Sequence, residues 1–516
     1  MHAKDKETQN IWKVIGASSV GTLIEWYDFY IFGSLATVIA NQFFPKTNPT
    51  AALLSTLATF AAGFIVRPFG ALVFGRLGDL IGRKYTFLLT LILMGGSTFA
   101  IGLVPSYESI GFAAPIIVLI LRLLQGLALG GEYGGAATYV AEHAPPNRRG
   151  YFTSWIQTTA TLGLFVSLGV ILLTRHALDP DPQLSIAKFN DWGWRIPFLV
   201  SILLVIVSIY IRMRMKESPL FTKLKSEGKI SVNPLKESFT HKANLKMVLL
   251  ALFGATMGQG VIWYTGQFYA QSFIENVCKI DFDQSRTIII WAILFATPLF
   301  VVFGSWSDRV GRKWIMLVGM LAGILFYRPI YNQFLILSLS NLPAQQMNAP
   351  ASEGLAERKV VLLPGSMDSL VTTSALYVYP EQLQFKQVRT DTVFKNGPVH
   401  IGEAKIMEKK LFGSVYWKFV FLVFMQIVFV TMVYGPIAAF LVEMFPTKIR
   451  YTSMSLPYHV GNGVFGGLTP FIATLLTTIY TNDKLVGLWY PIIIAAVSLV
   501  IGTLYINNKI DPNVND

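Results

Sequence analysis

The sequence predicts an all-α membrane protein with twelve transmembrane helices in two halves of six, and with a small strand-containing insertion in the second half. Three observations support this fold class. Runs of about 20 apolar residues recur along the chain, charged residues are scarce, and two short motifs occur once in each half. Only 14% of the 516 residues are charged and 53% are hydrophobic, whereas a soluble domain contains about 25% charged residues. Most of the surface is therefore expected to face lipid.

The apolar runs define the predicted helices in chain order. A helix needs about 20 mainly apolar residues to cross the hydrocarbon core of a bilayer. The runs lie at 14–40, 51–75, 85–104, 112–138, 151–174, 194–212, 245–270, 287–305, 314–338, 413–440, 451–478 and 488–506. An even number of spans places both ends of the chain on the same side of the membrane.

The positive charge is distributed as a topology signal would be. The net charge is +13, and Lys and Arg gather in the segments that share a side with the N-terminus. These residues include Arg76, Arg83, Lys84, Arg148, Arg149, Arg309, Arg312, Lys313, Lys448, Arg450 and the basic residues of 212–246. The opposite loops hold few. Because cytoplasmic loops are enriched in Lys and Arg, both termini are predicted to be cytoplasmic, and a nucleic-acid partner is not expected.

Two pairs of motifs divide the chain into parallel repeats. GRLGDLIGRK at 75–84 resembles GSWSDRVGRK at 304–313, after the second and eighth spans. EHAPPNRR from Glu142 resembles EMFPTKIR from Glu443, after the fourth and tenth spans. Self-similarity of this kind indicates repeated structure. We therefore predict an N-terminal six-helix bundle at 1–212, a cytoplasmic linker at 213–244 and a C-terminal six-helix bundle at 245–516.

The second half is longer because of a polar interval at 340–412, between the ninth and tenth spans. The charge pattern places this interval on the extracytoplasmic side. VVLLP, SALYVYP and LQFKQVRTDTVF within it are rich in β-branched and aromatic residues and are bounded by Pro and Gly, which favours short strands. The interval is predicted to form a small strand-rich cap, and a loop without regular structure is the alternative.

Several other classes of protein are disfavoured. The single cysteine, Cys278, leaves no pair for an internal disulfide and no cysteine cluster for zinc. GGEYGG lacks the Gly-Lys-Ser/Thr ending of a phosphate-binding loop and lies within a span. The N-terminal stretch mixes both signs of charge, so the first apolar run is interpreted as a retained helix rather than a signal peptide. We expect no enzyme activity, no cofactor and no metal site.

At this point the sequence resembles the major facilitator superfamily and, more narrowly, its metabolite:proton symporter family. The motifs that carry the resemblance, besides the 75–84 and 304–313 pair, are IEWYDFYIFG, VRPFGALVFGRLGD, RLLQGLALGGEYGGA, WGWRIPFLVS, KESPLF and EMFPTKIRYTSMSLPYH. The resemblance implies two six-helix bundles around a central cavity that opens alternately to each side. It also implies a bacterial inner membrane and uptake of organic acids, such as citrate, 2-oxoglutarate or shikimate, or of zwitterions such as proline and betaine. We expect a monomer.

Two carboxylates in the first span are the candidate proton site. Glu25 and Asp28 are three residues apart, so they are neighbours on one helix. Acidic residues inside a span are costly and are functional by default, and two of them close together in a low dielectric favour binding of a proton. Arg122 in the fourth span is the predicted cationic partner. The alternative is a buried ion network that only locks the bundles together.

The candidate substrate site combines arginines with polar and aromatic residues. Arg67 and Arg328 lie deep in the second and ninth spans, and a guanidinium binds a carboxylate with two hydrogen bonds. Spans that line the cavity in the family fold also carry Tyr27, Gln125, Gln157, Trp263, Tyr264, Gln267, His459 and Asn462. His459 is a group that titrates near neutral pH, and the two adjacent aromatic residues suit a quaternary ammonium. The alternative for the histidine and the aromatics is plain packing.

The paired motifs supply the candidate gating residues. By resemblance, they bridge neighbouring helices at the cytoplasmic end and hold the outward-facing state. The set comprises Gly75, Asp79, Gly82, Arg83, Glu142, Arg148, Gly304, Asp308, Gly311, Arg312, Glu443 and Arg450. The alternative is that their charges only set topology.

The sequence thus predicts secondary active transport, in which a proton moving down its gradient biases the side to which the cavity opens. Proton-coupled symport of a small organic acid is the leading interpretation, since several buried arginines favour an anion. Uptake of proline or betaine is the second. An exporter of the same fold and a non-transporting sensor, which the insertion suggests, remain as rivals.

Overall fold

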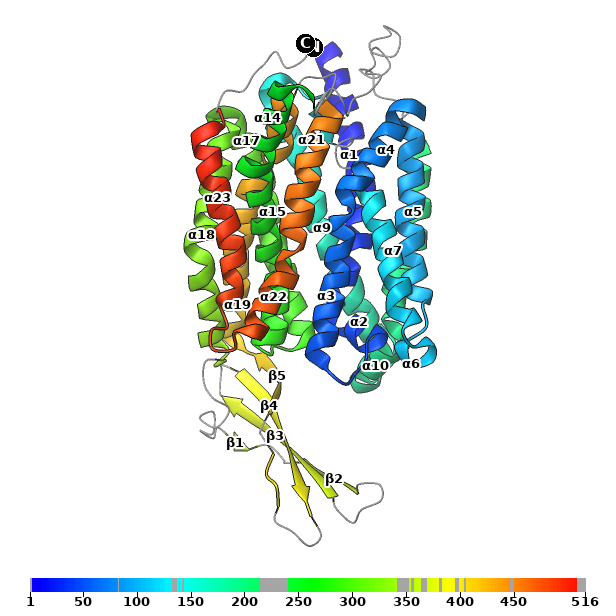
Figure 1. Cartoon of the computed structure of the whole chain (residues 1–516), viewed down its shortest axis with the longest axis vertical. Coiled ribbons are helices and arrows are strands. Elements are labelled where there is room, and N and C mark those ends of the chain that lie inside the picture. Colours follow the sequence, from blue (N-terminus) through cyan, green and yellow to red (C-terminus); the bar gives the residue numbers. More distant parts are fainter. Residues whose placement is uncertain are drawn as a thin grey trace. The chain divides into compact units, whose positions relative to one another are not determined.

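The computed structural model describes most of the chain (Figure 1). The described residues are 2–81, 83–131, 137–138, 140–141, 143–213, 240–340, 352–353, 357–362, 369–379, 383–394, 399–402, 405–445 and 450–507. They form two compact units. The first comprises Met1–Phe268, Ile293–Tyr327 and Gln426–Asp516, and the second comprises Tyr269–Ala292 and Arg328–Met425. The predicted domain boundaries at 212, 244 and within 340–412 follow the internal repeat instead, and they stay a prediction.

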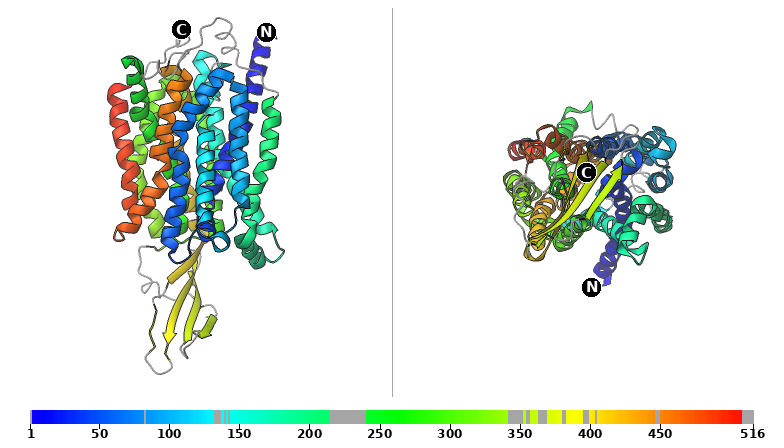
Figure 2. Two further views of the ribbon diagram at one scale, coloured as in Figure 1. Left: turned by 45° about the vertical axis from the view of Figure 1, so that its right-hand side comes forward. Right: turned by 90° about the horizontal axis from the view of Figure 1, so that it is seen from below.

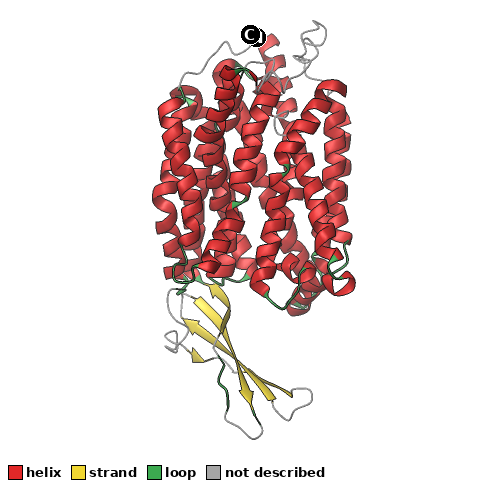
Figure 3. Cartoon of the chain, in the orientation of Figure 1, coloured by secondary structure: helices red, strands yellow, loops and turns green. Residues whose placement is uncertain are grey.

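Helices make up most of the described residues (Figure 3). In the first half of the chain they are α1 (His2–Ser34), α2 (Ala36–Phe43), α3 (Pro49–Ile65), α4 (Arg67–Ile81), α5 (Arg83–Leu103), α6 (Tyr107–Ile110), α7 (Ala113–Gly130), η1 (Pro146–Arg148), α9 (Arg149–Ala177), α10 (Pro182–Lys188), η2 (Phe189–Gly193) and α11 (Arg195–Met213). In the second half they are α14 (Lys242–Ala251), η3 (Leu252–Thr256), α15 (Met257–Tyr264), η4 (Thr265–Tyr269), α16 (Ala270–Ser272), η5 (Phe273–Val277), α17 (Phe282–Val310), α18 (Arg312–Leu337), α19 (Gly413–Tyr434), α20 (Ile437–Met444), α21 (Arg450–Tyr458), η7 (His459–Gly466), α22 (Thr469–Ile479), η8 (Val486–Leu488) and α23 (Trp489–Tyr505).

In the part of the chain that the structure describes, all twelve predicted spans coincide with helices. Among the described residues, nine helices are long and apolar enough to cross a bilayer, and two bent pairs raise this number to eleven. The remaining predicted span corresponds to the shorter apolar helix Leu88–Leu103. The first span is not straight, because Ser18–Ser34 and Ala36–Phe43 meet at 63°. The apolar runs predicted the spans but contained no signal for this bend.

The helices of the first unit pack in a few repeated contacts. α1 lies against α9 and α11, α5 lies against α7 and α11, and α7 lies against α3 and α4. In the second half of the chain, α15 lies against α23 and η7. The two halves meet where α3 and α4 contact η7 and α21, and where α9 contacts α20. These contacts place α1, α4, α7 and η7 around a common point, which holds the candidate site.

Close backbone contact between α3 and α7 depends on glycine. A Cβ atom added at Gly126 would lie 1.8 Å from the carbonyl oxygen of Gly63. No side chain fits that space, as expected for membrane helices that pack through small residues. We therefore expect Gly126→Ala to lower the free energy of unfolding by about 1–3 kcal/mol, the usual cost of overpacking. Thermal unfolding of the purified protein in detergent measures this effect.

The matched control is Gly169→Ala in α9, where a Cβ atom would meet nothing within 4 Å. That variant is expected to be as stable as the wild type or slightly more stable, because Ala is a better helix former than Gly. Equal melting temperatures for the two variants would contradict the packing argument.

The second unit contains a small antiparallel sheet, as predicted for the insertion between α18 and α19 (Figure 2). Its strands are β1 (Ser352–Glu353), β2 (Glu357–Leu362), β3 (Ser369–Tyr379), β4 (Leu383–Val393) and β5 (Lys405–Leu411). β3 and β4 form a long hairpin from Ser369↔Val393 to Tyr379↔Leu383, and β5 pairs with β4. β2, β3 and β4 match the three predicted segments. β5 was not predicted, because charged residues dominate KIMEKKL and strand propensity is weak there.

Candidate functional site

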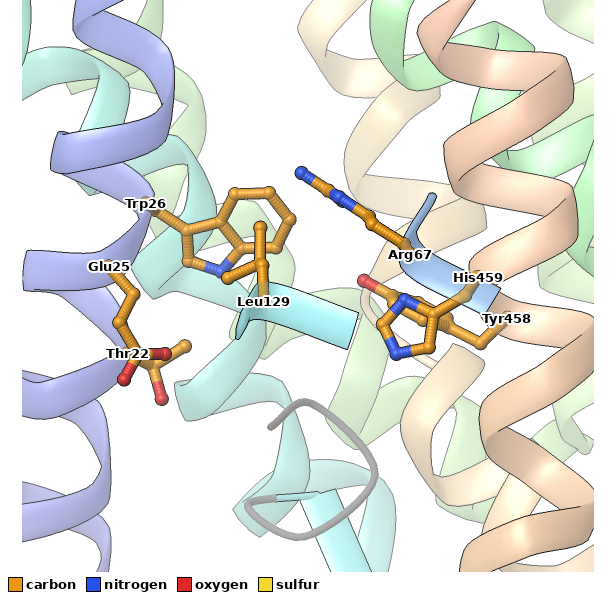
Figure 4. A pocket seen from close by; sticks show the side chains of 7 residues that line it. All are labelled: Thr22, Glu25, Trp26, Arg67, Leu129, Tyr458 and His459. Atoms are coloured by element: carbon orange, nitrogen blue, oxygen red, sulfur yellow. The ribbon is translucent and has the colours of Figure 1, made fainter. Parts of the chain in front are cut away.

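A cavity with room for about one water molecule lies among the helices of the first unit. Its lining residues come from α1, α4, α7, α21 and η7, and they are Thr22, Glu25, Trp26, Arg67, Leu129, Tyr458 and His459 (Figure 4). Glu25, Arg67 and His459 were predicted from the sequence, and the structure brings them together. All three are buried, so in this conformation the cavity is closed and has no room for a metabolite.

Proline residues place the two basic side chains of the cavity. Arg67 is the first residue of α4, directly after the break at Val66 and before Pro68. Proline is tolerated in the first turn of a helix but not in its interior, which explains the break. His459 begins the π-helical stretch η7, two residues after Pro457. π-Helical turns are frequent at functional sites. Both side chains therefore project from points where the helix is interrupted.

Arg67 is held by aromatic rings rather than by carboxylates. The carbon of its guanidinium lies 4.0 Å from the ring centre of Phe64, 4.3 Å from that of Phe29 and 5.3 Å from that of Trp26. Cation–π contacts of this kind stabilise a desolvated guanidinium. Two of its nitrogens, Nε and Nη2, have no hydrogen-bond partner among the described residues. Because guanidinium nitrogens can only donate, they are free to bind an acceptor that enters the cavity.

An aromatic stack joins α1 to α15 beside this arginine. Trp26 and Tyr30 are stacked with ring centres 4.9 Å apart, and Tyr30 stacks on Trp263 at 5.3 Å. Tyr264 meets Phe64 edge-on at 5.0 Å. Trp263 and Tyr264 were predicted, whereas Trp26 and Tyr30 were missed. Their spacing of four residues, on the helix that carries Glu25, was the available signal.

The two carboxylates of α1 face different surroundings. Glu25 lines the cavity. Asp28 is fully buried, and its Oδ2 lies 3.4 Å from the position of a Cβ atom on Gly95 in α5, where Val205 of α11 also packs. Neither oxygen of Asp28 accepts a hydrogen bond from the described residues. Only one of the two candidate proton carriers therefore lines the same cavity as Arg67.

The predicted pairing of Asp28 with Arg122 is not made. Arg122 donates to the side chain of Gln125 at 2.7 Å and to the backbone oxygens of Phe29 at 3.2 Å and Phe60 at 3.4 Å. Gln125 in turn donates to Thr98 at 2.7 Å. Arg122 is bonded instead to Gln125 and to carbonyl groups of α1 and α3, whereas Asp28 packs toward Gly95 of α5. Gln125 holds Arg122 and does not line the cavity.

The remaining predicted substrate residues do not line this cavity. Tyr27 donates to the backbone oxygen of Pro197 in α11 at 2.8 Å, which directs it away from Arg67. Gln267 donates to Thr161 of α9 at 3.3 Å, and Asn462 accepts from Gln259 at 3.4 Å. Gln157 is buried within α9. Arg328 is half-buried and belongs to the second unit.

A charged network joins α9, α17, α18 and α20 in the first unit. Arg312 donates to Asp308 at 2.6 Å and, through two nitrogens, to Glu443 at 2.9 and 3.2 Å. Asp308 also accepts from the backbone N–H groups of Gly150 and Tyr151, at 2.8 and 2.9 Å. These groups belong to the first turn of α9, where a negative charge is favourable. We call these five residues the α9–α17 junction.

Glycines allow the close approach at this junction. A Cβ atom on Gly304 would lie 2.4 Å from the Cβ of Ser154 and 2.7 Å from the oxygen of Gly150. Gly311 has a φ of +96° between α17 and α18, a conformation that favours glycine. Both were predicted as members of the gating set, and their geometry explains why the motif needs glycine at these positions.

The other predicted gating residues differ in position. Arg148 is exposed and lies over the ring of Tyr151 at 5.0 Å, and buried Arg450 donates to the oxygen of Phe445 at 3.1 Å. Gly75, Asp79 and Arg83 lie in α4 and α5, but the side chains of Asp79 and Arg83 are outside the described part of the structure. Gly82 and Glu142 lie outside the described residues altogether.

Loss of the Asp308 charge is expected to weaken the α9–α17 junction. Asp308→Asn cannot accept from two N–H groups and Arg312 as a carboxylate does, and hydrogen bonds to charged groups contribute roughly 1.5–3 kcal/mol. We expect a lower melting temperature and a transport rate reduced about tenfold. Glu108→Gln is the matched control, because Glu108 pairs with Lys46 at an exposed site, where an ion pair contributes little. An Asp308→Asn variant as stable and as active as the wild type would contradict a gating role.

Comparison with known proteins identifies relatives along most of the chain. Residues 13–229 match the family described as "Sugar (and other) transporter". The inner membrane metabolite transport protein YhjE of Escherichia coli is 31% identical over 469 residues, which cover 91% of this chain and 88% of YhjE. The α-ketoglutarate permease of the same organism is 29% identical, with 96% and 94% covered. A proline/betaine transporter of Salmonella typhimurium is 28% identical, with 95% and 82% covered.

A solved structure shows the same fold. The proton:xylose symporter XylE, bound to a sugar analogue, aligns over 98% of this chain and 99% of its own with a TM-score of 0.67, at 13% identity. The two six-helix bundles of the major facilitator fold are therefore present here, with the sheet as an insertion in the second. The chain is a transporter rather than an enzyme, and it belongs to the metabolite:proton symporter family of the major facilitator superfamily, a multi-pass inner-membrane protein.

Proposed function

We propose that this chain takes up a small organic acid together with protons by alternating access. The observation that carries the proposal is the set of contacts that Arg67 makes. Its guanidinium is buried next to a cavity, is held by aromatic rings, and keeps two nitrogens without a hydrogen-bond partner among the described residues. Buried donors are normally satisfied. A carboxylate in the cavity satisfies both with a bidentate pair, which is the geometry that guanidinium favours.

Proton coupling is assigned to the carboxylates of α1. Asp28 is buried and accepts no hydrogen bond from the described residues. An isolated carboxylate in such surroundings takes up a proton rather than remain charged. Glu25 lines the same cavity as Arg67, so the charge of Glu25 and that of a substrate in the cavity influence each other. We assign the transported proton to Asp28 and the sensing of substrate to Glu25.

A zwitterion such as proline or betaine is the second candidate substrate. The observation that favours it is the pairing of charges in the cavity, since Glu25 and the rings of Trp26 and Tyr30 suit an ammonium while Arg67 suits the carboxylate. Relatives support both classes, because one is named an α-ketoglutarate permease and another a proline/betaine transporter.

The orientation in the membrane follows from the charge distribution. The basic segments lie on the side of both termini, and cytoplasmic loops are enriched in Lys and Arg. Both termini are therefore assigned to the cytoplasm and the sheet to the opposite side. In this orientation the α9–α17 junction lies at the cytoplasmic end. We propose that it keeps the cytoplasmic side closed while the outer side is open.

Substrate-induced proton flux in proteoliposomes with a trapped pH dye tests the proposal. The substrates to compare are 2-oxoglutarate, citrate, shikimate, proline and betaine, with empty liposomes as the control. Acidification of the lumen by an organic acid, and not by proline or betaine, is the expected result. Acidification by the zwitterions alone would replace the leading proposal with the second one. Uptake of radiolabelled substrate without any proton movement would overturn the coupling.

A further inference from the structure

The inserted sheet is fastened to the turn that follows the seventh span. The turn is residues 278–281, between η5 and α17. Within the second unit, the N–H of Lys409 in β5 donates to the oxygen of Lys279 at 2.8 Å, and the N–H of Asp281 donates to the oxygen of Lys409 at 2.8 Å. Ile280 and Lys409 thus form a parallel bridge. Strand β5 has β4 on one side and this turn on the other.

A second contact holds β5 at Leu411, two residues after Lys409. The side-chain amide of Gln284, in the first turn of α17, donates to the oxygen of Leu411 at 2.9 Å and accepts from the N–H of Leu411 at 2.7 Å. Gln284 therefore binds both backbone groups of Leu411, as a neighbouring strand would. The end of β5 is held at two successive outward-facing backbone positions.

The side chain of Lys409 ties the same strand to the end of α18. Only 2% of this lysine is exposed, and its ammonium donates to the backbone oxygen of Ser338 at 2.6 Å and to the hydroxyl of Ser340 at 2.9 Å. Ser338 directly follows α18, whose last carbonyl groups attract a cation. A buried ammonium is costly unless it is fully bonded, so Lys409 holds its position firmly.

The two segments that Lys409 joins are in an unusual backbone conformation. Lys279 has a φ of +60° and Leu339 has a φ of +53°. Residues other than glycine rarely adopt this region, and they persist in it only when their surroundings determine the conformation. Here the surroundings include the bonds from β5. Without them, both segments are expected to relax.

The turn also ends a helix that reaches the candidate site. The segment Lys242–Val277 is one continuous span. It carries Trp263, which stacks on Tyr30 of α1, and Gln267, which donates to Thr161 of α9. These contacts join the span to α1 and α9, and the stack of Trp263 on Tyr30 continues to Trp26, which lines the cavity. Three π-helical stretches, η3, η4 and η5, interrupt the regular α-helix of this span, and π-helical turns are frequent at functional sites.

We infer that the inserted sheet is a brace: β5, through Lys409 and Gln284, holds the turn 278–281 and thereby sets how readily the span Lys242–Val277 departs from its closed position. The sheet is then a built-in control on the rate of opening, and not a substrate-binding module. The anchoring of the turn stands on its own, whereas the effect on opening rests on the proposed transport function.

Cys278 provides a direct readout, because it is the only cysteine in the chain, is fully buried and lies in the braced turn. The rate of its alkylation by a small maleimide is measured by mass spectrometry in nanodiscs. The variants are Lys409→Met, which keeps the length of the side chain but loses the ammonium, and Gln284→Leu. The matched control is Lys410→Met, since Lys410 is the neighbouring lysine and is exposed.

Cys278 is expected to react about tenfold faster in Lys409→Met and in Gln284→Leu than in the wild type, reflecting the lost hydrogen bonds. The rate in Lys410→Met is expected to stay within about twofold of the wild type. Equal protection of Cys278 in all folded variants overturns the brace. If Lys409→Met does not yield a folded protein by gel filtration, Gln284→Leu decides, because its polar contacts are only partly buried.

Uptake assays test the second half of the inference. With a substrate that the wild type transports, Lys409→Met is expected to change the initial uptake rate at least about threefold while Lys410→Met does not. If Cys278 is alkylated faster but the uptake rate is unchanged, the proposal that the sheet controls the opening of the span is overturned. If the wild type takes up none of the probes 2-oxoglutarate, citrate, shikimate, proline and betaine, the proposed function fails, and the alkylation rates still decide whether the sheet anchors the turn.

Discussion

Replacing Arg67 with lysine is expected to weaken substrate binding by about 10- to 100-fold while leaving the protein folded. A hydrogen bond to a charged group contributes roughly 1.5–3 kcal/mol, and each 1.4 kcal/mol is a factor of about ten in affinity. Lysine keeps the charge, but it lacks the planar fork that grips a carboxylate and that packs against Phe29 and Phe64. The KM for uptake, measured in proteoliposomes with the substrate that the flux assay identifies, gives the effect.

Arg175→Lys is the matched control for this prediction. Arg175 is also buried and lies over an aromatic ring, that of Phe189 at 5.9 Å, but it is at the end of α9 and does not line the cavity. Its replacement is expected to leave the KM unchanged. If Arg67→Lys transports with the KM of the wild type, the substrate carboxylate binds elsewhere and the proposed site is wrong.

The second large effect is expected from Asp28→Asn, which should abolish proton-driven accumulation and preserve exchange. Asparagine has nearly the shape of a protonated aspartate but cannot release a proton. Accumulation of substrate against its gradient is expected to fall by about 100-fold or more, as for loss of an essential proton-transfer group. Counterflow, in which labelled substrate exchanges for unlabelled substrate without net proton movement, is expected to continue. Comparing the two assays on one preparation separates coupling from binding.

Stability provides an independent check on Asp28→Asn. Neither oxygen of Asp28 accepts a hydrogen bond from the described residues. The substitution therefore breaks no hydrogen bond with any of these residues. The melting temperature is therefore expected to stay the same or to rise, in contrast to Asp308→Asn, whose carboxylate accepts several bonds.

Glu25→Gln distinguishes the two carboxylates. Glu25 lines the cavity, so its substitution is expected to change the KM while accumulation remains coupled to protons. The opposite pattern, with coupling lost in Glu25→Gln and retained in Asp28→Asn, would assign the proton to Glu25.

The spans and three of the cavity residues were accessible from the sequence because their signals are local. A run of apolar residues has to become a helix in a bilayer, since no water is present to satisfy its backbone groups. Glu25, Arg67 and His459 stand out as ionisable residues inside such runs. An ionisable side chain there is costly to bury in the bilayer, so its presence indicates a function. The strands β2, β3 and β4 were likewise visible from the β-branched and aromatic residues between turn signals.

Which way each side chain faces was decided by the tertiary structure. Glu25 and Asp28 are three residues apart, so on an ideal helix they differ in direction by roughly 60°. That angle is enough to send Glu25 into the cavity and Asp28 toward Gly95 of α5. Spacing along one helix contains no information about the neighbouring helices. The pairing of Asp28 with Arg122 failed for this reason, since Arg122 found carbonyl groups of α1 and α3 instead.

Lys409 is the clearest example of a residue whose contacts could not be predicted from its neighbours in the sequence. In the sequence it is one charged residue of the triplet Glu408–Lys409–Lys410, which argues for a solvated loop. In the fold it is buried and binds Ser338 and Ser340, about 70 positions earlier in the chain. The sequence by itself determined the membrane-spanning helices, the repeat and the ionisable residues within the spans, because hydropathy and desolvation act on each segment separately. Only the tertiary structure decided which of those residues meet, because contact depends on the rotation and packing of helices that are distant in the chain.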